Sequence, residues 1–192
     1  MKPSEILHQN IQEAQQVLSH FLSQEDQAKN FDHAVELMVA CLKNGGKIIS
    51  CGNGGSMCDA MHFAEELSGR FRENRRALAA VSISDPSHIS CVGNDYGYNF
   101  IFSRYLEALG KPGDVLLGIS TSGNSGNVLE AIKVAKEMGM KVVGLTGKGG
   151  GKMRGMCDAE ICAPTTPFAD RAQELHIKII HSFIQSIEAQ MG

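Results

Sequence analysis

The chain has 192 residues, of which 43% are hydrophobic and 20% are charged, and its formal net charge is −3. This length suits one domain with its own core, and the charge lacks the basic excess of a protein that binds nucleic acid. The sequence contains neither the apolar segment of a signal peptide nor ~18 consecutive apolar residues, so we predict a cytoplasmic protein without a membrane partner.

Two helices are expected before the first strand. The second of them covers Phe31–Leu42 and is followed by Asn44-Gly45-Gly46, a glycine stop. We assign residues 1–44 to packing and oligomerisation and residues 45–192 to an α/β core with a C-terminal helix, within a single domain of residues 1–192. The first helix is predicted from apolar residues at alternating steps of four and three, namely Leu7, Ile11, Ala14, Leu18 and Phe21.

Beyond residue 44, short strands rich in Val, Ile and Leu alternate with helical patterns. This order predicts an α/β three-layer sandwich with a five-stranded, mainly parallel sheet of the flavodoxin-like kind, whose ligands bind beyond the carboxyl ends of the strands. The expected strands are Lys47–Cys51, Leu78–Ile83, Asp114–Ile119, Lys141–Leu145 and Asp158–Cys162. The expected helices are Met57–Arg70, Tyr98–Leu109, Asn127–Met138 and Ala169–Gln190.

The most informative segment is Ser120-Thr121-Ser122-Gly123-Asn124-Ser125, which lies between an expected strand and an expected helix. Small hydroxyl side chains, free backbone N–H groups and the positive end of a helix dipole together favour a phosphate group. The segment holds no Lys or Arg, which favours a small phosphorylated metabolite over a polyphosphate or nucleic acid. We call residues 120–125 the hydroxyl loop.

A second candidate loop, Gly52-Asn53-Gly54-Gly55-Ser56, follows the first strand, and we call it the glycine loop. Met57 stands where the dinucleotide pattern G-x-G-x-x-G has its third glycine, so a nicotinamide site is poorly supported. We expect the backbone amides and Ser56 to face a ligand, and the alternative is a plain glycine turn. The stretch Gly147–Gly151 is expected to be a flexible loop, and Lys148 does not make it a Walker A motif.

Two helices carry candidate metal ligands or acid–base groups. His62 and Glu66 are four residues apart on one helix face, which suits two ligands of one metal or an acid–base pair, although surface helices often hold this pattern. On the last helix, either Gln173 or Glu174 can share a face with His181, and helix geometry does not choose between them. A lone histidine among isoleucines, such as His181, is also typical of a core residue.

Other polar residues and the cysteines have plainer interpretations. Asn94, Asp95, Arg70 and Asp170 are either sugar contacts or ordinary turn and cap residues. The cationic stretch Arg70–Arg76 is expected to be a solvated helix end and loop. The cysteines form no C-x-x-C pair and are expected to be small buried side chains in a reducing compartment: Cys41, Cys51, Cys58, Cys91, Cys157 and Cys162.

Four motifs in one order resemble the sugar isomerase (SIS) domain family: Cys51–Ser56, Asp59–Glu66, Gly118–Ser125 and Arg171–His176. Within it, the chain is similar to the sedoheptulose 7-phosphate isomerases from its first helix to its last, including Ser87–Asp95. The resemblance implies a cytoplasmic homotetramer that converts the ketose sedoheptulose 7-phosphate into the aldose D-glycero-D-manno-heptose 7-phosphate. This step begins ADP-heptose synthesis for lipopolysaccharide.

The resemblance also implies roles for individual residues. One zinc per subunit would be held by His62, Glu66, Gln173 and His181, so the family selects Gln173 over Glu174. Glu66 would move the carbon-bound proton and His181 would serve as the acid–base group for the oxygens. Because zinc lowers the basicity of a carboxylate, the combination of both roles in Glu66 stays open. The expected substrate contacts are Asn53, Gly54, Gly55, Ser56, Glu66, Arg70, Asn94, Asp95, Ser120, Thr121, Ser122, Ser125, Asp170 and Gln173.

Two alternatives stay in view. The first is a SIS-fold binding protein, such as the initiator-associating protein that contacts DnaA, but a pure binding module has no need for both Glu66 and His181. The second is an isomerase of another phosphosugar, since the length of the sugar is set by the shape of the pocket.

We also expect a homo-oligomer that assembles through helices. The first helix has a long apolar seam, and the last helix carries more apolar residues than one sheet needs. These are Ile177, Ile180, Phe183, Ile184 and Ile187.

Overall fold

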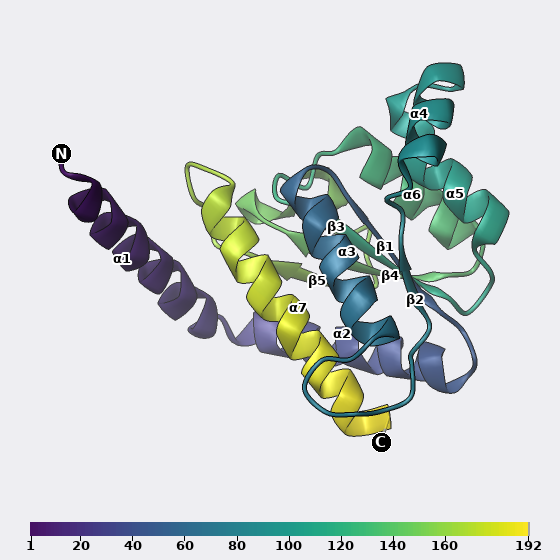
Figure 1. The fold of residues 1–192 in the computed structure, drawn as a ribbon, viewed down its shortest axis with the longest axis horizontal. Coiled ribbons are helices and arrows are strands. Elements are labelled where there is room, and N and C mark those ends of the chain that lie inside the picture. The colour runs from purple at the N-terminus through teal and green to yellow at the C-terminus, as the bar shows by residue number, and fades with distance from the viewer. Residues whose placement is uncertain (192) are drawn as a thin grey trace.

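The computed structural model describes residues 1–191 and has three layers, with a central sheet between two layers of helices (Figure 1). All four strand pairings are parallel, and the order is β2-β1-β3-β4-β5. This confirms the predicted fold class, and the order reverses between β1 and β3, where open α/β sheets bind their ligands. The strands are β1 (Ile48–Gly52), β2 (Ala80–Ser82), β3 (Val115–Ser120), β4 (Lys141–Thr146) and β5 (Ala159–Cys162).

Each face of the sheet packs against its own helices, because successive residues of a strand point to opposite faces. Ile48, Leu117 and Val143 face a core shared with the helices α2 (Glu25–Lys43), α3 (Gly55–Ser68) and α7 (Asp170–Met191). Ile49 and Leu116 face the core on the other side. The second core is shared with α4 (Pro86–Asp95), α5 (Ile101–Leu109) and α6 (Gly126–Glu137).

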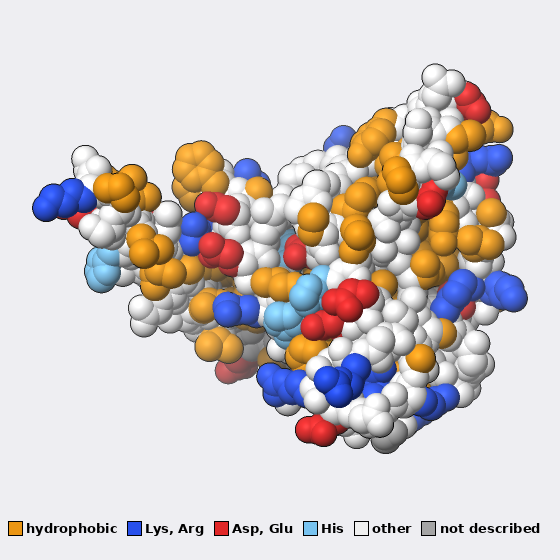
Figure 2. Space-filling view, viewed as in Figure 1, with side chains coloured by type: hydrophobic (Ala, Val, Ile, Leu, Met, Phe, Trp, Pro, Cys, Tyr) orange, Lys and Arg blue, Asp and Glu red, His pale blue; other side chains and the backbone are white. Residues whose placement is uncertain are grey.

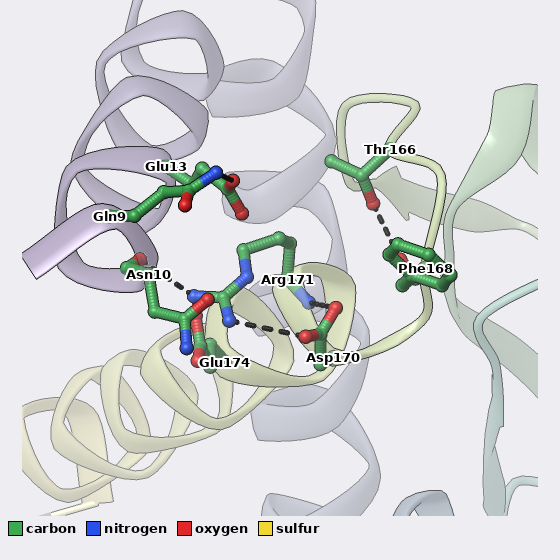
Figure 3. Close-up of polar contacts among 8 residues, drawn as sticks. All are labelled: Gln9, Asn10, Glu13, Thr166, Phe168, Asp170, Arg171 and Glu174. Carbon is green, nitrogen blue, oxygen red and sulfur yellow. Dashed lines mark hydrogen bonds and ion pairs between the residues drawn. The ribbon is translucent and has the colours of Figure 1, made fainter. Parts of the chain in front are cut away.

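The two N-terminal helices differ in their packing. α1 (Pro3–Leu22) extends away from the sheet (Figure 1), and each of its residues is at least partly exposed. In α2, by contrast, Ala34 and Met38 are fully buried in the core. The helix α1 is tied to α7 by Arg171, whose Nη1 donates to the Asn10 carbonyl oxygen at 2.9 Å (Figure 3).

The structure corrects several sequence predictions. The helix α4 lies where no helix was expected, although Asp85 accepts a hydrogen bond from the His88 N–H as its N-cap. Its interior has few apolar residues, so its periodicity is weak. Residues Tyr98–Phe100 form a short 3₁₀ helix (η1) before α5 rather than its first turn. Cys58 and Cys91 are exposed, so the expectation of buried cysteines is wrong for these two.

The remaining boundaries follow the predictions to within a few residues, except that α2 begins at Glu25, six residues before the predicted Phe31. Among the helices of residues 1–191, none combines the length and the apolar character that a membrane crossing requires.

Candidate functional site

The glycine loop and the hydroxyl loop lie next to each other because β1 and β3 are hydrogen-bonded neighbours, with Gly52 opposite Ile119. A pair of amides joins them. Asn53 Nδ2 donates to Asn127 Oδ1 at 2.8 Å, and Asn127 Nδ2 donates to Asn53 Oδ1 at the same distance. The Tyr98 hydroxyl also donates to Asn53 Oδ1, at 3.1 Å. The side chain of Asn53 is therefore engaged by the protein, and its backbone is the part left for a ligand.

Each loop leads directly into the N-terminus of a helix, which carries the positive end of a helix dipole. The N-caps are Gly54 for α3 and Ser125 for α6, and within residues 1–191 neither N-cap makes a side-chain capping bond. Gly54 has a φ of 56°, a conformation that favours glycine. Some of their N–H groups already have acceptors, because Ser56 and Met57 donate to the Asn53 and Gly54 carbonyls and Val128 donates to Asn127 Oδ1. Two helix N-termini close together nevertheless favour an anion through their remaining N–H groups and their dipoles.

The hydroxyl loop is held from behind by the short 3₁₀ segment η2 (Lys148–Met153). The Met153 N–H donates to the Gly123 carbonyl at 3.0 Å, and the Lys152 N–H donates to Asn124 Oδ1 at 3.1 Å. A Cβ atom on Gly123 would collide with the Gly150 carbonyl, so only glycine fits there. Gly149, Gly150 and Gly151 have positive φ and non-helical backbone angles, so residues 147–151 form a glycine-rich turn, in which Gly147 and Gly150 are buried.

The serines of the two loops are only partly available to a ligand. Ser120 is buried and its Oγ lies 2.9 Å from Ser125 Oγ, while Ser56 is buried at the start of α3. Ser122 Oγ accepts the Asn124 N–H at 3.2 Å and stays half-buried, as does Thr121. The hydroxyl loop therefore offers a few oriented hydroxyls together with backbone N–H groups.

A second group of side chains, which we call the His–Glu cluster, comprises His62, Glu66 and His181. His62 Nε2 lies 3.1 Å from Glu66 Oε1 and 3.1 Å from His181 Nε2, and one ligand atom from each residue lies within 4.8 Å of the others. Histidine and acidic side chains gather on the face formed by α3 and α7 (Figure 2). Phe71 stacks on the His181 ring at 5.6 Å between centroids, which covers one side of the cluster.

The donor set of this cluster fits a metal ion. Two imidazole nitrogens and a carboxylate are the ligands that zinc commonly takes. Glu66 Oε2 is buried without a hydrogen-bond partner among residues 1–191, and a buried carboxylate oxygen without a partner is costly. His62 Nε2 and His181 Nε2 lie 3.1 Å apart, within hydrogen-bond distance, and a shared ion would take the place of that hydrogen bond.

The structure distinguishes the two candidates on α7 that helix geometry left open. The Gln173 side chain lies against the glycine loop so closely that a Cβ atom on Gly55 would collide with its amide nitrogen. Glu174 is exposed and pairs with Arg171 Nη1 at 2.9 Å, which directs it toward α1. Gln173 therefore faces the glycine loop and Glu174 does not.

Four expected sugar contacts have other partners or none in residues 1–191. Asn94 Nδ2 donates to Asp95 Oδ1 at 2.8 Å at the exposed end of α4. Arg70 is exposed just beyond α3. Asp170 pairs with Arg171 (Figure 3), and the hydrogen bond from the Arg171 N–H lowers the pKa of the Asp170 carboxyl. Within residues 1–191, no hydrogen bond or ion pair joins these four side chains to the two loops.

Three residues near the site were missed from the sequence. Asn127 and Tyr98 lacked a signal because their role depends on the contact between two loops distant in sequence. Asp59 lies three residues before His62 on α3, and burial raises its pKa to about 6, an effect that nearby His62 opposes. The half-buried position of Asp59 on the inner side of α3 depends on packing, which periodicity alone does not reveal.

Comparisons with known proteins agree with this geometry. The sequence profile described as SIS domain matches residues 9–147. A protein named phosphoheptose isomerase from Cytophaga hutchinsonii is 63% identical over 181 residues, which cover 94% of this chain and 95% of that protein. One of the same name from Aeromonas salmonicida is 58% identical over 188 residues, 98% of each chain. The solved phosphoheptose isomerase GmhA from Neisseria gonorrhoeae superposes with a TM-score of 0.91 at 42% identity, covering 98% of this chain and all of that one. The chain belongs to the SIS domain family and, within it, to the phosphoheptose isomerases.

Proposed function

We propose that the chain interconverts the ketose sedoheptulose 7-phosphate and the aldose D-glycero-D-manno-heptose 7-phosphate. The relatives named phosphoheptose isomerase support this substrate class. This reaction would be the first step of ADP-heptose synthesis for lipopolysaccharide, and it would occur in the cytoplasm. The observation that carries the proposal is the pairing of an anion site, made by the N-termini of α3 and α6, with a carboxylate and imidazoles on α3 and α7.

The phosphate of the sugar would bind at the two loops. Its oxygens would accept hydrogen bonds from backbone N–H groups of residues 53–55, 121, 122 and 125 and from the hydroxyls of Thr121 and Ser122, since the N–H groups of Gly123 and Asn124 already have acceptors in the hydroxyl loop. A phosphate bound there holds the unreactive end of the substrate. The other end, with C1 and C2, is then free to extend toward Gln173 and the His–Glu cluster.

Glu66 would move the proton between C1 and C2 through a cis-enediol, and His181 would exchange protons with the sugar oxygens. The two oxygens of Glu66 allow a division of roles, because Oε1 lies beside His62 and Oε2 has no protein partner. His62, Glu66, Gln173 and His181 would hold one zinc ion. When bound, zinc supplies positive charge that polarises the sugar oxygens.

The test of activity is to incubate the pure protein with a panel of ketose and aldose phosphates of five, six and seven carbons. We expect isomerisation of the seven-carbon pair with the highest kcat/KM. A higher kcat/KM with a five- or six-carbon sugar phosphate would show that the proposed substrate is wrong and that the proposed reaction, aldose–ketose isomerisation, is right. If no sugar reacted with or without added zinc, the alternative of a binding protein for DnaA would be favoured.

The metal is tested separately by elemental analysis of freshly prepared protein. We expect about one zinc per chain in the wild type and a large loss in His62→Ala, because that change removes one of the proposed ligands. An unchanged zinc content in His62→Ala would contradict this ligand set.

We further propose a homo-oligomer, as a homotetramer by resemblance to the family. The exposed apolar side chains of α1 support it, since Ile6, Leu7 and Ile11 are 47%, 63% and 62% exposed. The last helix supports it less than expected, because Ile180, Phe183, Ile184 and Ile187 are fully buried inside a single chain. A monomer by light scattering at micromolar concentration would contradict the proposal.

A further inference from the structure

Arg75 was expected to be solvated as part of the cationic stretch of residues 70–76, but its side chain is only 6% exposed. Its guanidinium group lies at the C-terminal end of α3, where helix carbonyls lack intrahelical partners. Nη2 donates to the Glu66 carbonyl at 2.6 Å, and Nη1 donates to the Leu67 carbonyl at 2.8 Å and to the Gly69 carbonyl at 3.2 Å. The group therefore binds the backbone of Glu66 itself.

The same guanidinium group also binds α7. Nε donates to Glu188 Oε1 at 2.8 Å, and the Glu188 side chain is only 12% exposed. Glu188 lies seven residues after His181, which places both side chains on one face of α7, two turns apart. Arg75 thus connects the backbone of one member of the His–Glu cluster with the helix face that carries another.

The hydrogen bonds of Arg75 are directional, whereas the buried cluster that α3 and α7 share is apolar. Phe63 and Leu67 of α3 share a buried cluster with Ile180 and Ile184 of α7. Apolar packing is not directional, whereas a planar guanidinium group fixes both distance and orientation through several charge-assisted hydrogen bonds. A shift of α3 along α7 would break the contact to Glu66 or the contact to Glu188.

We propose that Arg75, paired with Glu188, is a positioning residue that sets α3 and α7 at the separation the His–Glu cluster needs. This inference rests on the proposed roles of Glu66 and His181. Arg75 itself acts only through other residues. The effect of removing it should therefore appear in properties of the cluster and not merely in the stability of the fold.

The test measures zinc affinity by competition with a chromophoric chelator at 20 °C, without substrate, together with Tm. Arg75→Met should raise the Kd for zinc by at least about tenfold, the size typical of residues that support metal ligands. Arg75→Lys keeps the charge but loses the planar fork, so its Kd should lie between those of Arg75→Met and the wild type. Glu188→Gln should raise Kd by a smaller factor, since it keeps an acceptor for Nε.

The matched control is Lys47→Met, which removes another partly buried ion pair, to Asp114, at the N-terminal ends of β1 and β3, away from the two loops. Lys47→Met and Arg75→Met should each lower Tm by about 10 °C, because each leaves a buried carboxylate without its partner. Lys47→Met should leave the zinc Kd within about twofold of the wild type. Equal Kd values for Arg75→Met and the wild type would overturn the proposal. A loss of affinity in Lys47→Met as large as in Arg75→Met would also overturn it, because affinity would then only follow stability.

Two further outcomes are also informative. If Arg75→Met does not fold, the zinc Kd values of Arg75→Lys and Glu188→Gln test the proposal instead, and unchanged Kd values in both would overturn it. If the wild type binds no zinc, the metal assignment fails, and the rate of isomerisation then tests the positioning role of Arg75. A lower kcat with an unchanged KM in Arg75→Lys would then support the positioning role, and an unchanged kcat would exclude it.

Discussion

The two halves of the candidate site are built in different ways. The anion site consists mainly of backbone N–H groups at the N-termini of α3 and α6, held in place by neighbouring strands of one sheet. The His–Glu cluster consists of side chains on two helices, whose separation depends on helix packing. A backbone site tolerates many side-chain changes, whereas a side-chain site fails when one functional group is lost. The predictions below test this difference, from the largest expected effect to the smallest.

The largest effect is expected for Glu66→Gln. The amide keeps the shape of the side chain but cannot accept the proton from carbon, so kcat should fall by about 10²- to 10⁴-fold with little change in KM. The matched control is Glu65→Gln, since Glu65 is exposed on the same helix. Turnover of Glu66→Gln within a few-fold of the wild type would remove Glu66 from its assigned role.

A smaller effect is expected for Asn127→Ala, which removes one half of the amide pair between the loops. The Asn53 amide would lose two partners in a partly buried place, at a cost of about 1–3 kcal/mol. We expect KM to rise by about tenfold because the two helix N-termini lose their alignment. Steady-state kinetics with the heptose phosphate measure this, and an unchanged KM would show that the strands alone align the loops.

A still smaller effect is expected for Ser122→Ala. The change removes one hydroxyl while the backbone N–H groups of the hydroxyl loop remain, so KM should rise a few-fold, in line with about 1 kcal/mol for one hydrogen bond. The value of kcat should change less than KM, because the loop binds the unreactive end of the sugar. A loss confined to kcat would argue that the loop takes part in the chemistry.

The smallest effect concerns His176, which lies fully buried on α7 with Nε2 2.8 Å from the Thr146 carbonyl at the end of β4. Burial lowers the pKa of this histidine, so the unfolded chain binds a proton more readily than the folded one. Its contribution to stability is therefore full above the ordinary histidine pKa and declines as the pH falls below it, by at most about 1.4 kcal/mol per pH unit. Thermal unfolding between pH 5 and 8 should show a weaker acid dependence in His176→Gln than in the wild type; equal dependence would mean that other groups cause it.

Much of the fold could be predicted because local sequence patterns indicate the strands, the loops and most of the helices. The strands are runs of Val, Ile and Leu such as Val115–Leu117, and the loops after β1 and β3 are marked by glycines and hydroxyls. The spacing of His62 and Glu66 also predicted their shared helix face, which the 3.1 Å contact agrees with. These features depend on residues close together in the chain.

The rest depends on contacts between distant segments, which local patterns do not contain. Asn53 and Asn127 are 74 residues apart, and Arg75 and Glu188 are 113 residues apart. Arg75 stands among charged residues that are exposed, so its sequence context predicted solvent and not burial. For the same reason, the isoleucines of α7 suggested an interface between chains, whereas most of them fill the core of one chain.

The separation of His62 and His181 along the chain, 119 residues, has a consequence for folding. The anion site, with the N-terminus of α6 and the support of η2, is complete by residue 153, whereas the last member of the His–Glu cluster is His181. During synthesis, a nascent chain can therefore present the phosphate-binding loops well before it can carry out isomerisation.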